Sequence, residues 1–304
     1  MKKKHTLKQH NQAFSLIELS IVILIVGILV AGVTQSSRLV NLIKLSTAQS
    51  ITRSSEINSI QDMVFWVETT LETGITNSSG TFQLDDGGAI SSWNDINIRS
   101  NPKINLTQAT ALNQPTYKQV GINGLPSISF NGSSGILLNS TIVPLLAGDK
   151  NYSLILVWRA NSTTAAAGQN LISQSNAVVG ANDMASFSIL SSGLSGFSGG
   201  TNNYTPTAVI PNTNYISIIT VNDTLATNNI SVYTNSNTAV TGSSTTPTIL
   251  NLGAARFSIG ARVDSTQFFG GLISEAIIFD RTLKSDEVRA VNNYLSKKYA
   301  IKIS

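Results

Sequence analysis

The most restrictive feature of the sequence is an apolar run of 20 residues, Phe14 to Val33, with one charged residue, Glu18. A helix of about 20 apolar residues is long enough to cross the hydrocarbon core of a bilayer. The run follows four lysines, which favour a cytoplasmic amino end: Lys2, Lys3, Lys4 and Lys8. The sequence therefore predicts one membrane-spanning helix at residues 14–33, with the rest of the chain on the far side of the membrane.

Three interpretations fit such a segment: a cleaved secretory signal, a plain signal anchor, or a segment cut on its cytoplasmic side that keeps the whole apolar helix. Glu18 separates them, because a charge at helix depth costs about 2.5–3.5 kcal/mol on insertion scales and requires a partner. Arg38, the next cation, is about 30 Å further along a helix. Cleavage between Ala13 and Phe14 would create an α-amino cation one helical turn before Glu18, in the same chain or in a neighbour. The third interpretation is therefore favoured.

The lysine-rich leader is followed by the run Ala13-Phe14-Ser15-Leu16-Ile17-Glu18-Leu19. This arrangement resembles the prepilin signal of type IV pilins and type II secretion pseudopilins. The resemblance implies that a prepilin peptidase removes the leader, residues 1–13, and methylates the new amine of Phe14. It also implies that Glu18 pairs with the Phe14 amine of an adjacent subunit during filament assembly. The sequence departs from the family at Ala13, where glycine is usual, and at residues 33–35, which lack the proline of many pilins.

The same resemblance implies a location and a set of partners. It places the chain in the bacterial inner membrane as a single-pass protein with a cytoplasmic amino end and an extracytoplasmic body. The destination is then a periplasmic pseudopilus or a cell-surface pilus. The implied partners are the prepilin peptidase, other pilin or pseudopilin subunits and, before assembly, the lipid of the inner membrane.

Beyond the membrane, the helical pattern continues. Apolar residues recur at spacings of 3, 4, 3 and 4, as on one helix face: Ile57, Ile60, Val64, Val67 and Leu71. We therefore expect one helix over residues 14–72, extracytoplasmic after residue 33 and ended by Gly74. Trp66 flanks the apolar face, and we expect it to pack under the globular domain.

From about Ile75 the pattern changes to short alternating segments separated by Asn-Gly, Gly-Gly and proline turns. Strands are predicted at residues 127–130, 152–158, 187–190 and 229–233. Strands and helices do not alternate along this region, which favours an antiparallel sandwich over a parallel sheet. A final helix is predicted from Ser285 to Lys298, because Val288, Val291 and Leu295 share one face.

A second resemblance covers most of residues 76–304. The segment from Phe269 to Leu283, with the helix after it, looks like the closing strand and final helix of concanavalin-like, laminin-G-like jelly rolls. The opening strands of that family resemble Trp93-Asn94-Asp95, Gln114-Pro115-Thr116 and residues 125–132. The expected fold is thus a long amino-terminal transmembrane helix, then an all-β antiparallel jelly-roll sandwich over residues 76–304 with a short carboxy-terminal helix.

Composition removes several kinds of chemistry from the body of the chain. The absence of cysteine excludes disulfides, thiolate metal sites and cysteine nucleophiles, and the two histidines, His5 and His10, both lie in the leader. The chain has 20 basic and 16 acidic residues, and without the four leader lysines the balance is 16 − 16 = 0. We therefore expect no nucleic-acid partner.

Few acidic residues in the body are candidates for a site. Glu275 is the only acid within an apolar strand, and we expect it to accept hydrogen bonds from a neighbouring loop or from Arg281 rather than to act in catalysis. No catalytic residue is assigned. No cofactor is expected apart from calcium, for which the weak candidates are Asp85, Asp86, Asp183 and Asp223. None of these has the spacing of an EF-hand, and Asp-Gly and Asn-Asp pairs usually form turns.

These observations favour a non-enzymatic structural subunit, a minor pilin or pseudopilin of a type IV pilus or type II secretion-like filament that displays a jelly roll. The large domain favours a minor subunit. The alternative is a filament- or membrane-displayed adhesin that binds a carbohydrate or another surface. Aromatic residues such as Trp93, Tyr204 or Tyr215 would then stack on a sugar. A polysaccharide-active enzyme is the third hypothesis, since the fold family contains glycosidases.

Overall fold

The computed structural model describes residues 15–82, 84–139, 145–146, 151–164, 167–175, 184–199, 202–222, 224–225, 229–242 and 256–304. The chain divides into two compact units, Met1–Ile43 and Lys44–Ser304. Helix α1 (Leu16–Arg53) belongs mostly to the first unit, and its residues from Lys44 onward belong to the second. Each unit is described by itself.

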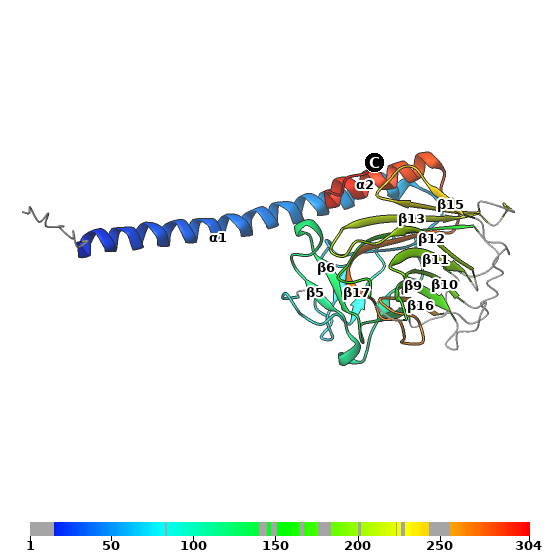
Figure 1. Ribbon diagram of the computed structural model, residues 1–304, viewed down its shortest axis with the longest axis horizontal. Helices are drawn as coiled ribbons and strands as arrows, with labels where there is room; N and C mark the ends of the chain where they lie inside the picture. The colour runs from blue at the N-terminus through cyan, green and yellow to red at the C-terminus, as the bar shows by residue number, and fades with distance from the viewer. Residues whose placement is uncertain are drawn as a thin grey trace, which may run out of the picture. The chain divides into compact units, whose positions relative to one another are not determined.

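In the first unit, α1 is one continuous helix (Figure 1), and its residues 16–33 are apolar apart from Glu18, Ser20 and two glycines. Every large apolar side chain from Leu16 to Val33 is at least 50% exposed within the chain. Among the described residues, this is the one helix long and apolar enough to cross a membrane. A helix with this surface needs lipid or another protein to cover it.

The predicted helix over residues 14–72 is wrong beyond Arg53. After α1 come a 3₁₀ turn, η1 (Glu56–Ser59), and a strand, β1 (Met63–Glu68). The Ser55 side chain caps the new turn by accepting the N–H of Ile57 at 3.2 Å. The β1 segment is rich in valine and aromatic residues, which favour strands, and it pairs antiparallel with β17 (Gly270–Phe279).

The second unit is a sandwich of two antiparallel sheets, as predicted. In sheet A the strand order is β15 (Val240–Gly242), β14 (Ile230–Thr234), β13 (Tyr215–Val221), β8 (Tyr152–Ala160), β17, β6 (Ser127–Asn131) and β5 (Thr116–Lys118), and β1 also pairs with β17. In sheet B it is β12 (Asn202–Ala208), β11 (Leu194–Gly199), β10 (Met184–Ile189), β9 (Gln169–Ser175), β16 (Arg256–Ile259), β7 (Leu137–Asn139), β4 (Leu106–Thr107), β3 (Ser92–Trp93) and β2 (Ile75–Thr76).

Three short elements complete the unit: η2 (Ala111–Asn113), η3 (Ile122–Gly124) and the carboxy-terminal helix α2 (Ser285–Tyr299). The predicted final helix is therefore confirmed. Because β1 and the end of α1 belong to this unit, the folded domain begins before residue 76, the predicted boundary.

The unit contains two hydrophobic clusters. One fills the space between the sheets and includes the buried rings of Phe65, Trp93, Phe130, Trp158 and Phe187. The other lies on the outer face of sheet A, where residues of α2 and of the end of α1 pack on β1, β8 and β17. Sheet A is thus covered on both faces, and its strand β17 is buried on both sides.

The close packing of the inner cluster generates a prediction about Gly260, which follows β16 with a φ of +93°. A Cβ at this position would overlap the buried ring of Phe130. Overpacking of this kind costs about 1–3 kcal/mol, and the left-handed backbone adds about 1–2 kcal/mol. We expect Gly260→Ala to lower the free energy of unfolding of Lys44–Ser304, a unit with its own core, in a urea titration.

Gly80→Ala is the matched control, because Gly80 has a φ of +73° and no atom within 4 Å of its added Cβ. It incurs the backbone cost without the overlap. Equal losses of stability in the two variants would contradict the packing argument.

Candidate functional site

The first candidate site is the amino end of α1. The Oε2 atom of Glu18 accepts the backbone N–H of Ser15 at 2.9 Å, so the side chain turns back toward the first turn of the helix. A carboxylate in this position is favoured by the free N–H groups and the dipole of a helix amino terminus. Ser15 directly follows Phe14, the predicted new amino terminus. Ala13 and Phe14 themselves lie outside the described residues.

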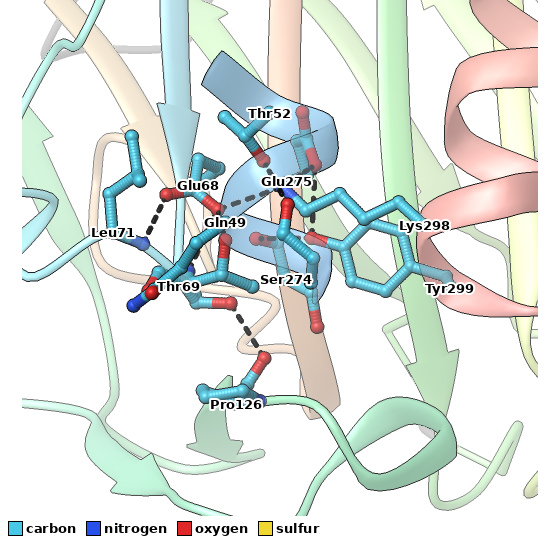
Figure 2. A network of polar contacts seen from close by, with 12 residues as sticks. Gln49, Thr52, Glu68, Thr69, Leu71, Pro126, Ser274, Glu275, Lys298 and Tyr299 are labelled. Atoms are coloured by element: carbon cyan, nitrogen blue, oxygen red, sulfur yellow. Dashed lines mark hydrogen bonds and ion pairs between the residues drawn. The ribbon is translucent and has the colours of Figure 1, made fainter. Parts of the chain in front are cut away.

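The second candidate site is a buried polar cluster in the Lys44–Ser304 unit (Figure 2). Strands β1 and β17 place Glu68 directly opposite Glu275, and α2 brings Lys298 between them. The Nζ atom of Lys298 lies 2.8 Å from Glu68 Oε2 and 2.8 Å from Glu275 Oε2, and all three side chains are 0% exposed. We call these three residues the ion cluster.

Each carboxylate of the ion cluster also accepts hydrogen bonds from its surroundings. Glu275 receives three besides that of Lys298: Trp66 Nε1–H at 2.8 Å, Tyr294 O–H at 2.8 Å and Tyr299 O–H at 2.9 Å. Glu68 receives three from the chain just after β1: Thr70 N–H at 2.7 Å, Thr70 O–H at 2.5 Å and Leu71 N–H at 2.6 Å. The lone pairs of both buried groups are therefore well satisfied, as burial requires.

The electrostatics of the two acids differ. Burial raises the pKa of Glu275. The charge of Lys298 acts to lower this pKa and the charge of Glu68 acts to raise it, and the net shift is upward. Burial also acts to raise the pKa of Glu68, but the charge of Lys298 and the hydrogen bonds from Lys298 and Thr70 outweigh it and lower the pKa. One lysine serves two carboxylates, so the cluster holds one acid that retains its proton more readily than the other.

The ammonium of Lys298 is surrounded by acidic and aromatic groups that favour its positive charge. Burial lowers its pKa, but the charges of Glu275 and Glu68 outweigh this and raise it. Its Nζ atom also lies 5.6 Å from the ring centroid of Tyr294 and 5.2 Å from that of Tyr299, within cation–π range.

Only part of this site was predicted from the sequence. The expectation that Glu275 is a paired, buried carboxylate is confirmed, but the expected donors, a neighbouring loop or Arg281, are wrong, because the donors come from β1 and α2. Arg281 instead binds Glu287 at 2.6 Å and Asp62 at 3.4 Å. Glu68 was missed because its segment was assigned to a helix. Lys298 could have been found, since it continues the apolar face of α2, 7 residues after Val291 and 3 after Leu295.

The calcium candidates do not gather into a site in the described part of the chain. Asp86 is exposed, forms an ion pair with Lys118 at 2.9 Å and accepts the N–H of Gln119 at 2.7 Å. Asp85 begins a turn closed by the N–H of Gly88. Among the described residues, no group of three or more acidic or histidine side chains is placed to hold a metal. Asp183 and Asp223 lie outside the described residues.

The aromatic candidates for sugar stacking are buried where the structure describes them. Trp93 is 0% exposed and donates its Nε1–H to the backbone oxygen of Glu68 at 3.0 Å. Tyr215 is 6% exposed and stacks on Trp158 with ring centroids 4.7 Å apart. The side chain of Tyr204 lies outside the described set. Trp66, 2% exposed, packs in the domain as predicted.

Comparison with protein families identifies both parts of the chain. Residues 8–34 match the prokaryotic N-terminal methylation motif, which includes the predicted cleavage position and Glu18. Together with the apolar helix, this motif indicates a pilin-like protein and is consistent with anchoring in the inner membrane. Residues 130–289, more than half of the chain, match the concanavalin A-like lectin/glucanases superfamily. The chain belongs to that superfamily.

Two structures of one sialidase support the fold. A sialidase of Trypanosoma rangeli in complex with sialic acid has a TM-score of 0.51 and 15% identity over 80% of this chain and 34% of its own. The same sialidase alone gives 0.51 and 14% over the same shares. Domain 4 of AbnA, an extracellular arabinanase of Geobacillus stearothermophilus in complex with arabinotriose, gives 0.48 and 15% over 77% of this chain and 98% of its own.

The chain thus spans about a third of the sialidases it matches (34%), and at this identity the likeness concerns the fold only. A search among curated proteins finds no significant match.

The ion cluster generates a prediction about Lys298. In Lys298→Met, two buried carboxylates lose their cation, and breaking a buried ion pair in this way costs about 3–5 kcal/mol. We expect that loss in the free energy of unfolding of the Lys44–Ser304 unit, measured by urea titration.

Lys118→Met is the control, because the Lys118–Asp86 pair is exposed and such pairs contribute about 0–1 kcal/mol. If Lys298→Met were no more destabilising than this control, the ion cluster would not have the structural role assigned to it.

Proposed function

We propose that this chain is a non-enzymatic structural subunit, a minor pilin or pseudopilin, of a type IV pilus or type II secretion-like filament. In this role a prepilin peptidase removes residues 1–13 and methylates Phe14. The observation that supports the proposal best is the methylation motif at residues 8–34, joined to a helix whose apolar side chains the rest of the chain leaves exposed.

The exposed helix suits two successive environments. Inner-membrane lipid covers the apolar surface of residues 16–33 before assembly, and helices of neighbouring subunits cover it afterwards. The lysine-rich leader favours a cytoplasmic amino end. The Lys44–Ser304 unit then lies on the far side of the inner membrane from the cytoplasm, in a periplasmic pseudopilus or on a cell-surface pilus.

Glu18 supplies the assembly contact in this proposal. A carboxylate in an apolar helix bundle requires a cation, and the Phe14 amine of an adjacent subunit provides one after cleavage. The bond from Ser15 N–H to Glu18 supports this role, because it holds the carboxylate at the end of the helix where that amine must approach. Within the described residues, Ser15 is the only hydrogen-bond partner of the Glu18 side chain.

The interior of the domain supports a structural role over an enzymatic one. Glu68 and Glu275 face each other, as a pair of catalytic carboxylates would, but both are 0% exposed and surrounded by donors from the chain itself. A glycan cannot reach them without unfolding of the surrounding structure. The burial of Trp93 and Tyr215 likewise favours the structural subunit over the carbohydrate-binding adhesin.

A substitution at Glu18 tests the proposal. We expect Glu18→Ala to be cleaved by the prepilin peptidase but to be at least tenfold less abundant than the wild type in sheared filaments, because its amine partner is lost. Immunoblots of membrane and filament fractions measure both quantities. Glu72→Ala, at an exposed glutamate of the domain, is the control and should enter filaments normally. Equal incorporation of Glu18→Ala and wild type would contradict the assembly role.

A further inference from the structure

The ion cluster takes no part in the proposed filament contacts, yet it combines groups that can react with one another. An amine lies within hydrogen-bond distance of two carboxyl groups, and all three side chains are 0% exposed. With both acids ionised and Lys298 protonated, the cluster carries one net negative charge in the core. Charges held in such a place are costly, so a reaction that removes an ion pair is favoured by its surroundings.

We propose that Lys298 and Glu275 condense to an intramolecular isopeptide bond that joins α2 covalently to β17. The contact that supports this assignment is the 2.8 Å separation between Lys298 Nζ and Glu275 Oε2. The bond is an amide between the two side chains, formed with loss of one water molecule.

The neighbours of Glu275 suit it as the electrophile. Its Oε1 atom accepts hydrogen bonds from Trp66 Nε1 and Tyr294 O–H, each at 2.8 Å. Two donors on one carboxyl oxygen stabilise the negative charge that develops there when the carbonyl carbon is attacked, as in an oxyanion hole. The Oε2 atom accepts the O–H of Tyr299 at 2.9 Å, which places a donor on the oxygen that leaves.

Glu68 suits the role of base. Its Oε2 atom lies 2.8 Å from Lys298 Nζ, on the amine that must lose a proton. The lowered pKa of Glu68 keeps it as a carboxylate, and the raised pKa of Glu275 leaves that group able to hold a proton as a neutral acid.

The reaction balances without any further reactant. A proton passes from Lys298 to Glu275 and leaves a neutral amine beside a neutral carboxylic acid. The nitrogen lone pair attacks the Glu275 carbonyl carbon and forms the C–N bond, while Glu68 accepts a proton from the nitrogen. Glu68 returns that proton to Oε2, the C–O bond breaks, and water leaves. No atom changes its oxidation state, so the step needs no oxidant or cofactor.

The bond would provide a covalent link that the composition otherwise excludes. The chain has no cysteine, so disulfides cannot stabilise its exported domain. The new bond ties the last helix to β17, which pairs with β1, β6 and β8 in sheet A.

The test is the intact mass of purified Lys44–Ser304, which is independent of leader removal and methylation. We expect a mass lower than that of the sequence by one water molecule, and a tryptic digest should contain a branched peptide that joins Glu275 to Lys298. The full sequence mass in a folded sample, with a cooperative thermal transition, would overturn the proposal. A branch at Glu68 in place of Glu275 would overturn the assignment of the electrophile.

Two variants separate the roles. Glu68→Gln keeps the shape of the base but removes its proton affinity, and we expect this variant to fold and to retain the full mass for at least tenfold longer than the wild type. Glu287→Gln, on the same helix but paired with Arg281 outside the cluster, should lose water as the wild type does. Equally fast water loss in Glu68→Gln would overturn the role of Glu68 as base.

Discussion

The meeting of Glu68, Glu275 and Lys298 is the interaction on which the rest of the domain depends. These residues come from β1, β17 and α2, so one buried contact joins the first strand, a central strand and the last helix. Both carboxylates contact Lys298 in the core, and the lysine reaches them only when α2 lies on sheet A. The packing of α2 on the outer face of sheet A therefore depends on the contacts of the ion cluster.

The end of α1 joins the same arrangement. Gln49 donates its side-chain N–H to the backbone oxygen of Thr70 at 2.9 Å, just beyond Glu68, and Thr52 lies 3.4 Å from the hydroxyl of Tyr294. Ala48 is buried in the cluster of apolar residues on the outer face of sheet A. The residues from Lys44 to Arg53 thus belong to the folded domain although they continue the apolar helix.

Local patterns were sufficient for much of this architecture. The apolar run, the alternating strands and the face of the final helix each depend on neighbours in sequence, and the helices and strands predicted from them are confirmed. The strand β1 could not be found in this way, because its valine and aromatic residues also fit a helical spacing. Its pairing partner lies about 200 residues away, with Trp66 opposite Ile277. Lys298 lies on the apolar face of the final helix, three residues after Leu295, but its partners come from β1 and β17, so the sequence alone does not name them.

The proposed assembly role depends most directly on what happens at Phe14. The decisive measurement is mass spectrometry of the amino-terminal peptide of this chain, isolated from the membranes and sheared filaments of cells with an active prepilin peptidase. We predict a peptide that begins at N-methylated Phe14 in both fractions. A peptide that begins in the leader, before residue 14, in those cells would contradict this prediction. The chain would then be a concanavalin A-like domain attached to an uncleaved membrane anchor.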